Sequence, residues 1–567
     1  MKNLTAAVVI LMMFLLPCLP QENVQRRPSS QSIRLMLDPK YKPTTRPKPV
    51  KSATPFIALS HMRRNELSMQ SRASIAQAFL VAETQTSKLS PPGRFRIHYD
   101  TAGYNTPALL DPTQQSRLPD TYEAYVDSVA AIFDYCWRFH IDSLGYRPPA
   151  SDGGWGGGPE YDVFIQELDP SLFGFTAYDD STRVNPSTDP ARYWTYTVVD
   201  NDYLGYRTSG MDGLRATAAH EFQHAIHLGG YGMWNDRDIY FFELSAGWME
   251  GVTFPTVHDY YYDVSEYFTT FRDSRGTLSF YYFDPLFIGS ERGIWGQFLS
   301  QRFGRDVMRD IWEHEITEPV LSSINNALLP HGTDFATEFS LFTYWNYFTA
   351  DRADTVRYYR EGSHYPRFTP NLTATVFSGG AVSISSQAYH FASNFYEFPL
   401  PTDTLTAIIT NADLSAAQQY DFTTRALQIE IGASVVNLPI QVLPNGLKIG
   451  FGVTDGNKWT ERYLLASSRS DIQKTNLEAS PNPLRLSQAP HLALPVNEPF
   501  NSLAQIYFFS SALALEYSAS YTVVEFNGGK FVFVPSADLR SHVSSGVHFV
   551  FAYAGSSVYH WKVAVIK

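Results

Sequence analysis

A run of eight residues, "HEFQHAIH" at positions 220–227, constrains the fold more than any other stretch of this chain. In an α-helix, residues i and i+4 lie one above the other on the same face. His220 and His224 have this spacing, so both imidazoles can bind one ion at roughly 2.0–2.1 Å, with Glu221 beside them. The run therefore predicts a metal-binding helix. The alternative interpretation is a surface helix whose histidines and glutamate are simply solvated.

The residues around this run indicate where the helix begins and ends. Asp212 can act as its N-cap, and Gly229 with Gly230 can stop it. His227 shares a face with the two other histidines, but three histidines on one straight helix span roughly 10 Å of rise. All three cannot bind one ion, so we assign His227 to packing or to a hydrogen bond with a ligand residue.

A catalytic zinc site usually has three protein ligands, so one ligand is missing from this helix. A third histidine in the pattern H-E-x-x-H-x-x-G-x-x-H is excluded, because position 227 is His and position 230 is Gly. The other source is a glutamate on a following helix, and "FELSAGWMEG" offers Glu243 and Glu250. These two lie seven residues apart, about two helical turns, so helix geometry alone leaves both open.

The distance to the first of these glutamates resembles that in the gluzincin metallopeptidases. Residues 225 to 242, eighteen in all, separate His224 from Glu243. The third ligand of that family is a glutamate in an N-E-G-x-A-like segment at about this distance. Phe242 departs from the frequent Asn, while Ala246 keeps the Ala three residues after the glutamate. The match is closest to secreted bacterial members and covers about residues 94 to 350.

The resemblance implies a zinc-dependent endopeptidase with an α+β, zincin-like catalytic domain. It implies three ligands for Zn²⁺: His220, His224 and Glu243. Glu250 would then hydrogen-bond a ligand histidine, or serve as the alternative ligand. Glu221 would be the general base that takes a proton from a metal-bound water while peptide bonds are hydrolysed. Tyr281 and Tyr282 are candidates for stabilising the oxyanion, although packing of these aromatics in the core is the competing interpretation.

The order of predicted elements also favours an α+β fold. Alternating residues predict strands at 94–100, 161–168 and 193–200, and an apolar stripe predicts a helix that ends near Cys136. Helical patterns also dominate from about residue 293 to 350. Cys136 occupies an apolar position of that helix and is expected to be buried. "YTVVDNDY", which begins at Tyr196, is a candidate edge strand that would bind an extended peptide substrate by adding it to the sheet.

The start of the chain predicts export. Lys2 followed by "LTAAVVILMMFLLP" has the pattern of a secretory signal peptide, and no other segment has the pattern of a transmembrane helix. The full chain has two cysteines, Cys18 and Cys136, so removal of the signal would leave no partner for a disulfide. The net charge of -12 argues against nucleic acid as a partner. We expect a protein that is secreted or held at the cell surface, with a peptide or protein as its substrate.

Composition divides the chain further, because its length exceeds what one hydrophobic core usually supports. After about residue 370 the sequence changes to short alternating strands with turn residues, which predicts all-β modules, immunoglobulin-like sandwiches, behind the catalytic domain. We expect five regions: a signal peptide at 1–21, a linker or pro-region at 22–90, the catalytic domain at 91–368, a β-rich accessory domain at 369–474 and a C-terminal β-sandwich at 475–567.

The C-terminal region carries a second resemblance. "SPNPL" at 480–484, "SSGVHFVFAYAG" at 544–555 and the terminal "KVAVIK" are similar to the sorting domains of proteins exported by type IX secretion. This resemblance implies the secretion machinery as a partner, and a generic accessory β-sandwich is the competing interpretation. For the whole protein, the alternative function is a cell-surface binding or adhesion protein whose metal domain is degenerate or hydrolyses a non-peptide substrate.

Overall fold

The computed structural model divides the chain into two compact units, residues 1–471 and 472–567. The structure describes these residues: 7–13, 50–62, 67–70, 72, 83–170, 172–178, 182–184, 191–232, 238–269, 278–279, 289–374, 383–384, 391–399, 405–411, 423–430, 435–438, 440–442, 448–451, 460–469, 479, 481–496, 498–499, 501–511, 514–526, 529–554 and 557–567. The predicted arrangement of an α+β region followed by β-rich regions is confirmed at this level.

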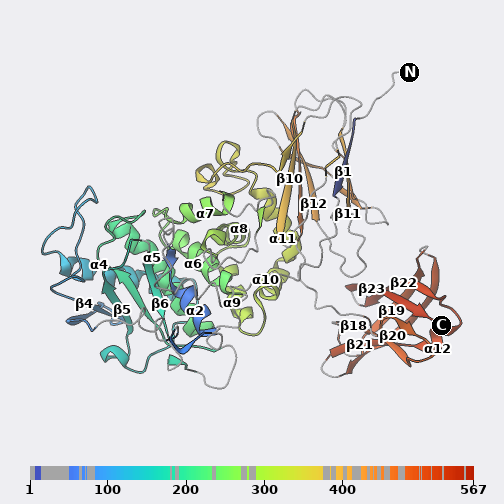
Figure 1. Ribbon diagram of the computed structural model, residues 1–567, viewed down its shortest axis with the longest axis horizontal. Helices are drawn as coiled ribbons and strands as arrows, with labels where there is room; N and C mark the ends of the chain where they lie inside the picture. The colour runs from blue at the N-terminus through green and yellow to red at the C-terminus, as the bar shows by residue number, and fades with distance from the viewer. Residues whose placement is uncertain are drawn as a thin grey trace. The chain divides into compact units, whose positions relative to one another are not determined.

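The amino-terminal part of the first unit is built on a mixed sheet (Figure 1). Its strands are β2 (Val50–Ser52), β3 (Thr86–Leu89), β4 (Phe95–Tyr99), β5 (Tyr161–Gln166), β6 (Leu172–Ala177) and β7 (Tyr196–Asp200). They are ordered β2-β6-β7-β5-β4-β3. The central strands β4, β5 and β7 run parallel, whereas β3 is antiparallel to β4 and β6 is antiparallel to β7. Strand β2 pairs in parallel with β6 and forms one edge.

Two helices cover one face of this sheet. Helix α4 (Tyr122–Trp137) contacts β4, helix α5 (Gly210–Ile226) contacts β6 and β7, and the two helices contact each other. Strand β6 approaches α5 closely because it carries Gly174, where a Cβ atom would lie 2.6 Å from Thr217 Cγ2. Cys136 on α4 is fully buried, as its apolar position predicts, and burial raises the pKa of its thiol.

A layer of helices follows the sheet, and its first helix carries Glu243 and Glu250. Its helices are α6 (Ile239–Thr253), α7 (Tyr260–Thr269), α8 (Gly293–Phe303), α9 (Asp306–Glu315), α10 (Val320–Leu328) and α11 (Phe335–Trp345). The helices expected between residues 293 and 350 are therefore confirmed. Helix α6 packs along α5 and also contacts α8. Fourteen of the fifteen residues of α6 are buried, so both faces of this helix are held by neighbours.

The β-rich part of the first unit packs on α11. Strands β12 (Thr423–Glu430) and β16 (Thr460–Arg469) pair with each other and contact this helix. β16 also pairs with β10 (Ala392–Pro399). Arg425 of β12 donates a hydrogen bond from Nε to Ser340 Oγ of α11 at 2.7 Å. A second sheet has the order β1-β11-β15-β14, with strands β1 (Ala7–Met13), β11 (Leu405–Asn411), β14 (Ile440–Val442) and β15 (Lys448–Phe451).

Strand β1 comes from the expected signal peptide. In the full chain it pairs in parallel with β11, from Ala7 opposite Leu405 to Met13 opposite Asn411. Cleavage of a signal peptide would remove this strand and leave β11 paired with β15 alone among the described strands. The signal peptide itself stays a prediction.

The second unit is a sheet of seven strands around one core, with the order β17-β23-β22-β19-β20-β21-β18. The strands are β17 (Leu484–Arg485), β18 (His491–Pro495), β19 (Leu503–Ser510), β20 (Leu515–Phe526), β21 (Gly529–Pro535), β22 (Gly546–Ala554) and β23 (Ser557–Ile566). The first part of the long strand β20 pairs with β19 and its last part with β21. The Asn482 side chain binds both Lys562 O and Ala564 N of β23, at 2.8 and 3.0 Å.

The amino-terminal region is more ordered than a linker would be. Residues 22–90 were expected to be a linker or a pro-region, and the burial of residues 51–55 excludes a solvated linker for that part. Strand pairing and ion pairs stabilise this part in place of apolar packing. The first strand expected from alternation was 94–100, but β3 precedes it and pairs with β4.

In the described part of the chain, every helix is too short or too polar to cross a bilayer.

Candidate metal centre

Helix α5 carries the histidine motif as predicted. It begins after Ser209, whose backbone is extended, and Asp212 lies in its first turn rather than at the N-cap. A carboxylate in the first turn still favours the helix, because it faces the positive end of the helix dipole. His220, Glu221 and His224 are fully buried, so the solvated surface helix considered as an alternative is excluded.

Helix α6 brings Glu243 to both histidines. Glu243 Oε2 lies 3.3 Å from His220 Nε2, and Glu243 Oε1 lies 2.8 Å from His224 Nε2. Ligand atoms of these three residues all lie within 4.8 Å of one another. Glu243 Oε2 also accepts a hydrogen bond from Ser290 Oγ at 2.6 Å. Ser290 can come this close because Gly247 lies one turn after Glu243, and a Cβ there would be 3.0 Å from Ser290 O.

The facing atoms of this cluster lack hydrogen-bond partners. Among the described residues, His220 Nε2, His224 Nε2 and Glu243 Oε1 have none, although each is buried. The 2.8 Å separation of His224 Nε2 and Glu243 Oε1 is a close approach without hydrogen-bond alignment. Buried polar atoms without partners are costly, and two imidazoles with one carboxylate are a donor set that zinc prefers. The residues present therefore fit a zinc ion.

Glu250 lies on the other side of His220. Its Oε1 is 2.8 Å from His220 Nδ1, where it can accept the ring proton and leave the Nε2 lone pair facing Glu243. Burial lowers the pKa of His220, but Glu243 and Glu250 outweigh burial and raise this pKa to about 10. The two carboxylates thus favour a positive charge beside them, which either a proton on His220 or a bound cation would supply. The structure brings Glu243 to both histidines and Glu250 to one.

Charged side chains extend from Glu250 to the amino-terminal segment. Lys51 Nζ of β2 lies 3.1 Å from Glu250 Oε2 and also contacts Asp259. Burial alone would lower the pKa of Lys51, but Asp259 and Glu250 outweigh it and raise that pKa. Arg207 pairs with Asp259 at 3.0 Å and with Asp263 at 3.2 Å. Every one of these charges therefore has an oppositely charged neighbour.

Glu221 points toward β6 and the segment after β2. Its Oε2 accepts hydrogen bonds from Thr176 Oγ1 at 3.0 Å and from Thr54 Oγ1 at 2.9 Å. Its Oε1 is buried and has no hydrogen-bond partner among the described residues. Sequence reasoning missed Thr54, Thr176, Lys51 and Ser290, because each reaches the motif from a distant part of the chain. No local pattern signals such contacts.

His227 is separate from the cluster, as the helix geometry predicts. It stacks on Trp312 with ring centroids 3.9 Å apart, and its Nε2 lies 2.9 Å from Gln223 Nε2 and 3.4 Å from Ser245 Oγ. Burial, followed by His224, holds the pKa of His227 well below its ordinary value. Its role is packing and a local hydrogen bond. Tyr281 and Tyr282, the candidate oxyanion stabilisers, lie outside the described residues.

The strand expected to bind substrate does not lie at an edge. Strand β7 pairs with β5 on one side and with β6 on the other, so its backbone has no free side for a peptide. That prediction is wrong, because the alternation of residues in a strand does not tell its place in the sheet. The strand beside α5 that lies next to the edge is β6, which sequence reasoning missed. Its outer side is paired with β2, the edge strand itself.

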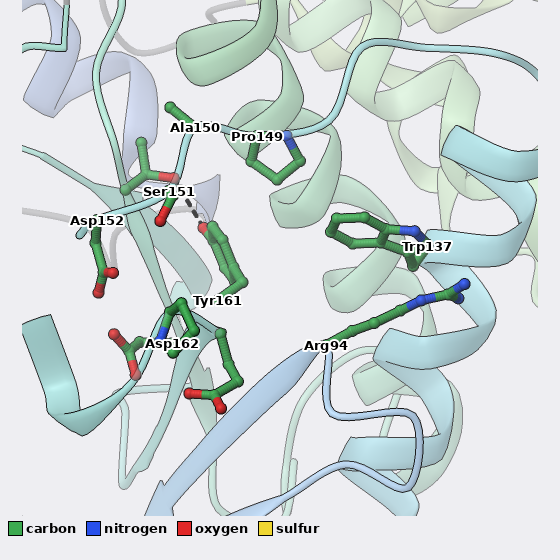
Figure 2. Close-up of a pocket in the computed structure, with 11 residues that line it drawn as sticks. Arg94, Trp137, Pro149, Ala150, Ser151, Asp152, Tyr161 and Asp162 are labelled. Carbon is green, nitrogen blue, oxygen red and sulfur yellow. Dashed lines mark hydrogen bonds between the residues drawn. The ribbon is translucent and has the colours of Figure 1, made fainter. Parts of the chain in front are cut away.

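A cavity of about 170 Å³ lies elsewhere, between β5 and the end of α4 (Figure 2). Trp137, Arg94 and Tyr161 are among its lining residues, and the Tyr161 hydroxyl shares a hydrogen bond with Thr195 at 2.9 Å. The residues of the metal cluster do not line it. We therefore base the function on the cluster, where donor atoms converge, and not on this cavity.

Comparison with known proteins does not identify a family. No protein-family model matches the chain, and no curated protein matches it. A pullulanase of Group B Streptococcus matches with a TM-score of 0.12 and 9% identity, over 25% of this chain and 23% of that one. A tandem-repeat region of a large adhesion protein has a TM-score of 0.11 and 14% identity, over 26% and 41%. A pullulanase of Anoxybacillus sp. bound to maltotriose has a TM-score of 0.11 and 8% identity, over 31% and 28%. The chain spans less than half of each, and likenesses this weak carry no argument.

Proposed function

We propose that this protein is an exported zinc-dependent endopeptidase with a zincin-like catalytic domain. One observation carries the proposal: a buried site where His220, His224 and Glu243 converge through atoms that have no hydrogen-bond partner in the described part of the chain, next to Glu221. This combination of two imidazoles, a carboxylate ligand and an adjacent glutamate suits metal-assisted hydrolysis.

The roles of the residues follow from their contacts. Zinc held by His220, His224 and Glu243 would supply Lewis-acid chemistry, polarising a scissile carbonyl and lowering the pKa of water. Glu221 would take a proton on Oε1, the carboxylate oxygen left without a partner, and pass it to the leaving amine nitrogen. Thr176 would orient the carboxylate through Oε2. Glu250 would hold the proton of His220 on Nδ1.

The β-rich regions would act in export and accessory roles. We propose that the second unit is an immunoglobulin-like sorting module, recognised by a secretion machinery of the type IX kind. Support comes from Asn482 of the "SPNPL" stretch, which binds the backbone of β23, the strand that contains most of the terminal "KVAVIK". Two of the three stretches that carry the resemblance are thus in direct contact.

The catalytic proposal is tested by Glu221→Ala in the full chain. We expect casein hydrolysis to fall by about 10²–10⁴-fold while zinc content stays unchanged, because Glu221 moves a proton and binds no metal. Casein hydrolysis and zinc content would be measured on the same preparations. Undiminished hydrolysis in the variant would contradict the role of Glu221. Bound zinc without cleavage of any member of a peptide library would favour a non-peptide hydrolase or a binding protein.

A further inference from the structure

Residues 50–62 lie against strand β6 and reach the carboxylate of Glu221. They form strand β2 and helix α2 (Thr54–Met62), which contacts both β6 and α6. β2 pairs with β6, the strand beside the motif helix, through Val50 opposite Leu172 and Ser52 opposite Gly174. The Ala53 N–H continues this pairing with a hydrogen bond to Gly174 O at 3.3 Å. An extended chain added to a sheet edge is a general mode of peptide recognition.

Thr54 connects this strand directly to the proposed general base. Its hydroxyl accepts a hydrogen bond from the Thr176 N–H at 2.7 Å and donates one to Glu221 Oε2 at 2.9 Å. One side chain therefore uses both a backbone donor of β6 and the carboxylate that would take the proton. The segment therefore lies against the carboxylate of Glu221, directly beside Oε1, the oxygen that would take the proton.

Lys51 anchors the segment through charge. Its ammonium group is buried and is paired with Glu250 and Asp259. Each of these carboxylates has a second partner in the rest of the fold, because Glu250 binds His220 and Asp259 binds Arg207. Glu221 likewise keeps Thr176 when Thr54 leaves. If the segment leaves, Glu250, Asp259 and Glu221 each keep one partner, so no buried charge is left unpaired. A segment that leaves the site on activation has to meet this condition.

We propose that residues 50–62 are an autoinhibitory segment that occupies the peptide-binding edge of β6 and covers Glu221. The active enzyme binds an extended peptide along this edge in place of β2. This inference rests on the proposed function, since it assigns the substrate class and the regulation of the same site. The four motif and ligand residues are almost completely buried, so a substrate reaches them only after part of the fold moves.

The test reverses the anchoring charge in the full chain. In Lys51→Glu, a carboxylate faces Glu250 and Asp259, and repulsion disfavours the docked segment. We expect casein hydrolysis to rise more than about tenfold over wild type with zinc content unchanged. We also expect faster hydrogen exchange of the Ala53 amide, a readout that does not depend on activity. Adding Glu221→Ala to this variant should abolish the gain.

A matched control is Lys88→Glu, the same reversal in β3 at the opposite edge of the sheet. Lys88 pairs with Glu123 and Asp127 near the surface, so hydrolysis and exchange at Ala53 should stay at the wild-type level. A folded, zinc-bound Lys51→Glu protein that is no more active than wild type would overturn the inference. Absence of both zinc and hydrolysis in every variant would instead overturn the proposed function.

A second variant answers the question if Lys51→Glu fails to fold. Val50→Cys with Leu172→Cys, in a Cys18→Ser background, places cysteines at paired positions of β2 and β6. Paired positions of neighbouring strands lie within reach of a disulfide. We expect the oxidised protein to hydrolyse casein more than about tenfold slower than the reduced protein, and Leu172→Cys alone to be insensitive to redox state. Equal rates in the oxidised and reduced proteins would overturn the inference.

Discussion

The Nδ1 side and the Nε2 side of the His220 ring differ in how many of their charged and polar atoms have partners. On the Nδ1 side, Glu250 lies 2.8 Å away and is itself paired with Lys51 at 3.1 Å. On the Nε2 side, His220 Nε2, His224 Nε2 and Glu243 Oε1 have no hydrogen-bond partners among the described residues, and only Glu243 Oε2 is bound, by Ser290. Buried donors and acceptors without hydrogen-bond partners are rare in proteins and are expected chiefly where a ligand or an ion binds. The difference supports the proposal, in which Glu250 holds the ring from the Nδ1 side and the atoms on the Nε2 side bind the metal ion.

Removing the charge on the binding side should have the largest effect. We expect Glu243→Gln to lose nearly all zinc, with an affinity decrease greater than about 100-fold, because the amide keeps the shape but no longer offers a charged ligand. Competition with a chelator of known affinity would measure the decrease. Retention of wild-type affinity would show that Glu243 is not a ligand.

Glu250→Gln, on the Nδ1 side of His220, should lower the affinity for zinc less than Glu243→Gln does. We expect Glu250→Gln to lower zinc affinity by about 10–100-fold and to leave zinc bound after dialysis without chelator. The reason is that Glu250 orients His220 but does not reach the Nε2 side. The same chelator titration applies, with Glu243→Gln measured beside it. If Glu250→Gln lost more zinc than Glu243→Gln, the assignment of the two sides would be reversed.

The smallest effect on the metal should come from His227, which belongs to neither side. We expect His227→Phe to keep the stacking on Trp312 but to leave Gln223 without its partner, lowering the free energy of unfolding by about 1–2 kcal/mol. Urea denaturation would measure the loss, and zinc content should equal that of wild type. Any loss of zinc beyond that of Glu250→Gln would make His227 part of the site.

Much of the fold that holds the site follows from local patterns. Strand alternation predicted β4, β5 and β7, and apolar spacing predicted α4 and the helices after residue 293. Strand β6 was missed, since "LFGFTA" contains a glycine, which weakens the pattern of a strand. That glycine has a tertiary reason, because the strand lies against α5 at Gly174. A pattern read along the chain cannot show which neighbour a residue will meet.

The amino-terminal segment shows the same limit more strongly. Its composition indicated a linker, because few apolar side chains can form a core there. The structure places it on β6 through backbone pairing, and Thr54 reaches Glu221 across 167 positions of sequence. Every residue has a backbone carbonyl acceptor and every residue except proline has an N–H donor, so composition does not report this pairing.

The sequence by itself determined that His220 and His224 lie on one face of a helix with Glu221 beside them. That result needs only the period of the α-helix, which is a local property. The tertiary structure decided the rest: Glu243 faces both imidazoles, Glu250 lies behind His220, and Thr54 lies on Glu221. Glu243 and Glu250 share one face of α6, so only the packing of α6 along α5 separates their positions around His220. Packing between distant segments depends on side-chain volumes and strand partners, which no single stretch of sequence contains.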